Sequence, residues 1–170
     1  MASLMEDLLD VLGKEEQQYQ ELIELGKRKK EVVIKADIAA LDAITAEEQD
    51  AASVLQNLAN HRNRVLTDMA TVLGKSPENM TVTKMIGYLE GQPEEQAKLI
   101  QRRDTLLEAG TQMRAMNEQN EVLLKQALEM VEFDLTLLKS MKQAPETANY
   151  NRNAHNTGDI LGSSGFDAKQ

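Results

Sequence analysis

The sequence predicts an all-α protein, an elongated antiparallel bundle of three long helices plus one short helix, followed by a disordered C-terminal tail. Strong helix formers dominate the 170 residues, and only three residues are proline and nine are glycine, so long uninterrupted helices are possible. Apolar residues recur on alternating three- and four-residue steps in three long segments, which is typical of packed helices. Aromatic residues make up 3% of the chain, which is little for a β-rich core.

The first helix is expected from about Leu4 to Ile34. Apolar residues on one face of this segment favour a helix that packs in a core. Glu15 and Lys29 interrupt the face at two positions. Its other members are Met5, Leu8, Leu12, Tyr19, Leu22, Gly26 and Val33.

The second helix is expected after a tight turn at residues 34–36, with Asp37 as its N-cap, and is expected to end at Leu73. Eight of the ten residues in its seam are apolar over four heptads, which indicates coiled-coil packing. The two polar members, Glu48 and Arg62, are expected to help set the register between helices. The seam consists of Leu41, Ile44, Glu48, Ala51, Leu55, Leu58, Arg62, Val65, Met69 and Val72.

A Gly-Lys-Ser-Pro break at residues 74–77 ends this pattern. A short helix is expected from Thr81, its cap, to Glu90. Pro93 suits the first turn of the last and longest helix, which is expected over residues 93–142. The seam of this helix consists of Leu99, Leu106, Ala109, Met113, Met116, Asn120, Leu123, Ala127, Met130, Asp134, Leu137 and Met141.

The composition changes after Pro145 to a stretch rich in Asn, Gly, Ser, Asp and Ala. This composition cannot bury enough apolar surface to offset the entropy of ordering. We therefore expect one helical-bundle domain over residues 1–144 and a flexible polar tail over residues 145–170.

The long last helix carries a second apolar stripe beside its seam. A one-residue offset rotates this stripe by about 100° around the helix. The same line is mostly polar upstream, whereas it is wholly apolar from Leu124 onward. Two interpretations remain open, a wider core contact with the first helix or a second face for a partner helix. The stripe consists of Leu124, Leu128, Val131, Leu135 and Leu138.

The net charge of −9 disfavours nucleic acid and anionic membranes as partners, because both need basic patches. The only basic run, residues 27–30, is expected to complement the dipole of the first helix near its end. The N-terminus lacks the basic start and apolar run of a signal peptide, and no stretch approaches 18 apolar residues. We therefore expect a cytoplasmic protein that does not insert into membranes.

No pattern in the chain indicates catalysis, a metal site or a cofactor. Cysteine is absent, and neither histidine has a glutamate three residues before it. Residues 74–76 imitate the end of a phosphate-binding loop, but the position that needs glycine is Met69. The expected class is a binding protein and not an enzyme.

The signature Asn117-x-x-Asn120-x-x-Leu123-Leu124 is similar to the signature of the FlgN family. The second stripe that follows, the helix after Asp37 and a polar tail with Tyr150 and a later glycine extend the resemblance to nearly the whole chain. In this chain that glycine, Gly158, stands further from the tyrosine than is usual in the family.

The resemblance implies a cytosolic chaperone for hook-filament junction proteins of the FlgK and FlgL type. Such chaperones bind the C-terminal helical region of these proteins, prevent premature association and deliver them to the export-gate protein FlhA. Tyr150 is then expected to dock at the gate. The alternative is a homo-oligomeric coiled-coil scaffold that uses the same stripes. The residues expected to bind the substrate protein are Asn117, Asn120, Leu124, Leu128, Val131, Leu135 and Leu138.

Overall fold

The computed structural model describes residues 1–143, and this part of the chain contains four helices and no strand. They are α1 (Ala2–Ile34), α2 (Ile38–Val72), α3 (Val82–Tyr88) and α4 (Pro93–Gln143). The predicted all-α fold, with three long helices and one short helix, is confirmed. The helix ends differ from the sequence prediction by two residues or fewer.

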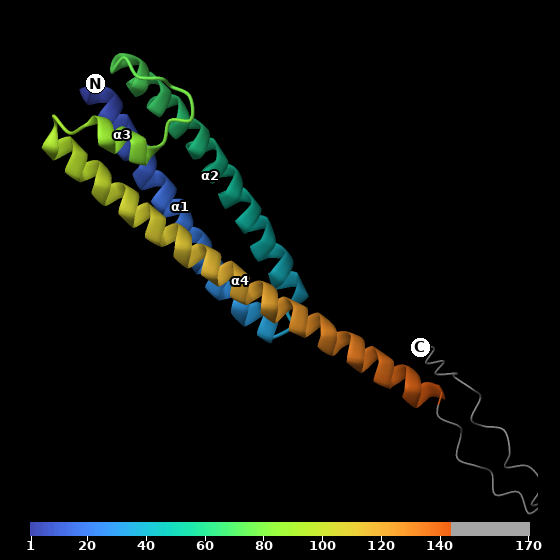
Figure 1. The fold of residues 1–170 in the computed structure, drawn as a ribbon. Helices are drawn as coiled ribbons and strands as arrows, with labels where there is room; N and C mark the ends of the chain where they lie inside the picture. The colour runs from blue at the N-terminus through green and yellow to red at the C-terminus, as the bar shows by residue number, and fades with distance from the viewer. Residues whose placement is uncertain (144–170) are drawn as a thin grey trace, which may run out of the picture. The chain divides into compact units, whose positions relative to one another are not determined.

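The described residues divide into two units. The first, Met1–Met130, contains α1, α2, α3 and most of α4, and in it α2 runs antiparallel to α1 and to the start of α4 (Figure 1). The second begins at Val131, and its described part is the last stretch of α4.

The predicted caps form at two helix starts. The Asp37 carboxylate accepts a hydrogen bond from the Ala40 N–H at 3.1 Å, and the Thr81 hydroxyl accepts one from the Lys84 N–H at 3.2 Å. Each cap satisfies a backbone donor that has no partner within the helix. The turn between α1 and α2 places Ala36 at φ +54°, in the left-handed region that favours glycine.

The apolar core of the first unit gathers around α3. Met85 and Leu89, from α3 and the residue that follows it, are 0% and 1% exposed. They pack with the start of α1, the end of α2 and the start of α4. The largest fully buried apolar side chains of this core are Leu8, Leu12, Leu66, Met69, Met85, Leu89 and Leu99.

One seam position of α2 was predicted wrongly. Val72 was assigned to the core face of α2, but its side chain is 59% exposed. After Met69 the buried face continues through Ala70 to the partly buried Leu73, which packs on the core. The last step of the seam is therefore four residues and not three, so Val72 points outward at the helix end.

Polar residues that interrupt the apolar stripes pair with one another across α1 and α2. Glu15 is 2% exposed, and both of its carboxylate oxygens accept from the Arg62 guanidinium, at 2.8 and 3.0 Å. Lys29 and Glu48 form a second, partly buried pair at 2.9 Å. Since each pair needs one alignment of the two helices, both pairs select this register.

Burial raises the pKa of the Glu15 carboxyl, and the Arg62 guanidinium opposes that effect.

Candidate functional site

The predicted second stripe of α4 is exposed over most of its length. Leu128, Val131, Leu135 and Leu138 are 60%, 53%, 52% and 53% exposed, whereas Leu124 is half-buried. These four side chains are not part of the core, so the core interpretation of the stripe does not hold for them. Exposed leucines in helical register form a continuous apolar surface, and surfaces of this kind mark interaction sites.

The seam residues of the same stretch are exposed as well. Met130, Leu137 and Met141 were predicted on a bundle seam, but they are 68%, 49% and 67% exposed. Phe133, which belongs to neither predicted stripe, is 66% exposed. Sequence reasoning missed it because it lies on a third line along the helix, and its aromatic ring was the only available signal.

Within the second unit, the exposed apolar side chains span about 200° of the helix circumference at 100° per residue. We call this surface the apolar face of α4. Thr136 and Lys139 lie on the remaining polar side. The apolar face consists of Val131, Phe133, Leu135, Leu137, Leu138 and Met141.

The two asparagines of the signature occupy different environments. Asn120 is 4% exposed, and its amide group donates to the Gly26 carbonyl of α1 at 2.8 Å, while its own Oδ1 has no hydrogen-bond partner. Asn117 is exposed and its amide lies 3.1 Å from the sulfur of Met113. The structure thus places Asn120 inside the bundle, where the sequence put it on the seam, and Asn117 at the surface.

The contact around Asn120 depends on glycine at position 26. A Cβ atom added there would lie 2.4 Å from Cγ of Met116, closer than real Cβ contacts allow. The backbones of α1 and α4 can approach at this point because Gly26 has no side chain.

Three predicted site residues line one groove in the first unit. Asn117, Asn120 and Leu124 from α4 face Leu22 of α1 and Leu55 of α2 across a space of about 520 Å³. The Lys29–Glu48 ion pair also lines this groove. It combines apolar walls with a few polar groups, the composition of many binding sites.

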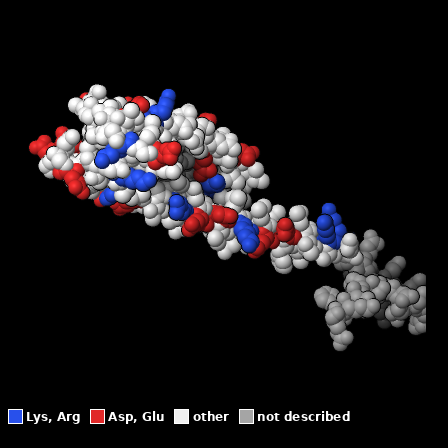
Figure 2. Space-filling view, turned by 45° about the horizontal axis from the view of Figure 1, so that its top comes forward, with Lys and Arg blue, Asp and Glu red and all other residues white. Residues whose placement is uncertain are grey.

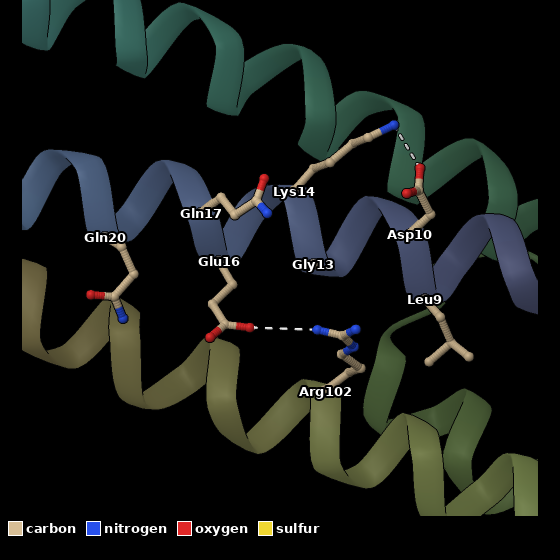
Figure 3. Close-up of a pocket in the computed structure, with 8 residues that line it drawn as sticks. All are labelled: Leu9, Asp10, Gly13, Lys14, Glu16, Gln17, Gln20 and Arg102. Carbon is tan, nitrogen blue, oxygen red and sulfur yellow. Dashed lines mark ion pairs between the residues drawn. The ribbon is translucent and has the colours of Figure 1, made fainter.

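A second hollow lies between α1 and α4, beside Gly13 (Figure 3). Its charged groups pair with one another: Lys14 with Asp10 at 2.6 Å, and Arg102 with Glu16 at 3.8 Å. The hydrogen bond that the Lys14 ammonium donates to the Asp10 carboxylate raises the pKa of Lys14. Paired, solvated charges of this kind are typical of a helix surface and indicate no chemistry.

The basic run at residues 27–30 is also engaged in ion pairs. Lys27 pairs with Glu24 at 2.7 Å, Arg28 with Glu47 at 3.2 Å, and Lys29 with Glu48. The last turn of α1 holds no basic residue, so the predicted role at the helix dipole is wrong. On the face shown in Figure 2, charges of both signs are mixed over the first unit.

Other classes of site find no support in residues 1–143. No cluster of three or more His, Asp or Glu side chains in this range could hold a metal ion. None of the described helices has a stretch both long and apolar enough to cross a membrane. Tyr150 and the tail at 145–170 lie outside the described residues.

Comparison with known proteins agrees with the signature in α4. The family described as FlgN protein matches residues 1–158, which is most of the chain. No curated protein and no solved structure gives a significant match. The chain therefore belongs to the FlgN family, the non-enzymatic flagellar export chaperones for hook-associated proteins.

Proposed function

We propose that this chain acts in the cytoplasm, where it binds the C-terminal helical region of a FlgK- or FlgL-type protein and delivers it to the export gate. The apolar face of α4 and the neighbouring Leu128 carry the proposal, because large apolar side chains lie exposed there in helical register. Within the first unit, Asn117 and Leu124 line a groove that offers a separate place for a partner to bind.

The exposed leucines can support a complex that forms in solution and still dissociates. Leu128 and Leu135 are 60% and 52% exposed, so covering what remains exposed contributes about 1 kcal/mol for each leucine. Several such side chains support a complex that forms in solution, while the entropy of ordering a partner helix keeps it reversible. A chaperone that must release its substrate needs this combination.

The same contact accounts for protection of the substrate. A helix that lies on the apolar face has its own apolar side covered, so it cannot associate with other subunits. Delivery to FlhA is a separate step, for which we propose Tyr150 as the docking residue. Its support is the family resemblance, together with the general ability of one buried tyrosine to anchor a short-lived contact.

The proposal is tested by charging the apolar surface. Leu128→Glu with Leu135→Glu should weaken binding to purified FlgK- and FlgL-type proteins by about a hundredfold or more, because two buried leucine contacts are lost and two carboxylates lose water. The matched control is Thr136→Glu with Gln143→Glu, which adds the same charge on the polar side of α4, about 80° around the helix from the two leucines. Equal affinities for the two double variants, measured by calorimetric titration, would exclude this surface.

The gate step has its own test. Tyr150→Ala should leave substrate affinity unchanged and weaken binding to the cytoplasmic domain of FlhA. Titration of one protein preparation against both ligands separates the two roles. An unchanged affinity for FlhA would remove Tyr150 from the proposal and leave the substrate site standing.

A homo-oligomeric scaffold remains the alternative, since an apolar helix face can also pair with a second copy. Sedimentation of the purified chain without a partner discriminates the two. A dimer that persists at nanomolar concentration favours the scaffold, and a monomer that binds a substrate protein favours the chaperone.

A further inference from the structure

One charged residue stands inside the apolar face of α4. Asp134 is exposed, and its nearest neighbours along the helix, three or four residues away in each direction, are all apolar. Their side chains are 68%, 53%, 49% and 53% exposed. These neighbours are Met130, Val131, Leu137 and Leu138.

The other acidic residue of the second unit's described part lies elsewhere. Glu132 is on the polar side of the helix, about 160° from Asp134. No Lys or Arg among residues 1–143 forms an ion pair with Asp134. In the free protein, water solvates this carboxylate. Its position among apolar side chains therefore costs little free energy until a partner covers the face.

Covering the face changes the electrostatics of Asp134. A wholly apolar partner would remove water from the carboxylate and supply no hydrogen bond or opposite charge, which is strongly unfavourable. A partner with a lysine or arginine at the opposing position would replace that water with a charge-assisted hydrogen bond. The face therefore discriminates between helices of equal hydrophobicity.

We propose that Asp134 selects the helix that binds to the apolar face of α4. The partner is an amphipathic helix whose apolar side carries one Lys or Arg, placed to lie over Asp134 in the complex. This inference rests on the proposed function, and it adds the chemistry by which one helical segment is accepted and another rejected.

Asp134 disfavours two ways of pairing this face with a second copy of the chain. Parallel in-register pairing, or antiparallel pairing centred on this turn, would place two Asp134 carboxylates against each other in an apolar interface. Like charges at a desolvated contact oppose association. An anionic membrane surface is disfavoured for the same reason.

The test is a charge reversal in the full chain, with the C-terminal helical segment of a FlgK- or FlgL-type protein as the probe. Asp134→Lys should weaken binding of the segment by about thirtyfold or more, since a cation then faces a cation in a desolvated contact. The control Glu132→Lys makes the same change of charge on the polar side and should alter affinity by less than about threefold. Both sites are exposed, so circular dichroism should show the same helicity in each variant.

A second round identifies the opposing cation. Each Lys and Arg of the segment is changed to Glu in turn, and one of these changes should weaken binding to the unaltered chain and restore binding to Asp134→Lys. If Asp134→Lys binds the unaltered segment as tightly as the unaltered chain does, the selection is refuted while the proposed function stands. If the unaltered chain binds neither segment nor intact protein, the proposed function fails and the selection falls with it.

Discussion

Gly26 offers a sharp test of the packing between α1 and α4. In an exposed helix interior, Gly→Ala stabilises by about 1 kcal/mol, because alanine has the higher helix propensity. At position 26 the new Cβ would lie 2.4 Å from Cγ of Met116, so the side chain or the helix must move. Overpacking of this kind costs about 1 to 3 kcal/mol. We expect Gly26→Ala to lower the free energy of unfolding by about 1 kcal/mol, which is the difference between these effects at the middle of the range.

The same displacement should disturb the hydrogen bond from Asn120 to the Gly26 carbonyl, which is 2.8 Å long and buried. Its loss would add about 1 kcal/mol to the destabilisation. The assay is urea unfolding followed by circular dichroism. A double-mutant cycle with Met116→Ala isolates the contact, because removing the Met116 side chain should recover part of the loss in the Gly26→Ala background.

Gly110 provides the matched control in α4. A Cβ at this position would lie 3.9 Å from the Tyr19 ring, which is ordinary van der Waals contact. Gly110→Ala should therefore stabilise the protein by about 1 kcal/mol through helix propensity alone. If Gly26→Ala and Gly110→Ala stabilise equally, the close approach of α1 and α4 at residue 26 is incorrect.

Three further predictions concern single sites. Ala36→Gly should stabilise by about 1 kcal/mol, because φ is +54° at this turn, and an unchanged urea midpoint would contradict the left-handed backbone. Burial raises the pKa of Glu15 above 4.5, so the folded state keeps a proton that the unfolded state releases, and stability falls as pH rises above 4.5. The Glu15→Gln variant has no carboxyl group to titrate at this position, so its stability should not show this fall. In urea titrations, the free energy of unfolding of the variant minus that of wild type should therefore increase as pH rises. Asn117→Ala should weaken substrate binding only, whereas Asn120→Leu should change stability or assembly; identical effects would contradict the separate environments of the two amides.

Local signals in the sequence were sufficient for the helices and their caps. Asp37 and Thr81 were predicted as N-caps, and both side chains accept the expected backbone hydrogen bonds. A cap depends on residues within one turn, so the sequence around it contains the needed information. The separation of Asn120 from Asn117 also followed from helical spacing alone.

Contacts between residues of different helices were harder to predict from the sequence. Glu15 and Arg62 were recognised as interruptions of two apolar stripes, but not as partners, because the register of an antiparallel pair depends on the whole interface. The groove beside Asn117 and Leu124 was not predicted, since it depends on the spacing of three helices. The sequence placed Gly26 on the apolar face of the first helix, but it did not predict the close approach to Met116 of α4.

The exposed part of α4 could not be distinguished from its buried part by sequence pattern. Met130, Leu137 and Met141 continue the seam with the same three- and four-residue steps as the buried Leu99 and Ala109. A heptad seam has the same sequence pattern whether its partner is in the same chain or in another protein. Only the fold shows which part of the seam is buried by other helices among residues 1–143.

The distribution of buried side chains within the first unit bears on how binding and stability are coupled. The large apolar core lies around α3, whereas near the α1–α2 turn the buried contacts include Asn120, Gly26 and the Lys29–Glu48 pair. The large apolar side chains buried at that end, Ile23, Leu25, Val33 and Ile44, are fewer than those around α3, so local opening should require less free energy there than around Met85. A partner that fills the adjoining groove would stabilise the closed arrangement by mass action. Substrate binding should therefore slow amide exchange near Gly26 and Asn120 more than around Met85, which links occupancy of the groove to order in the helices that line it.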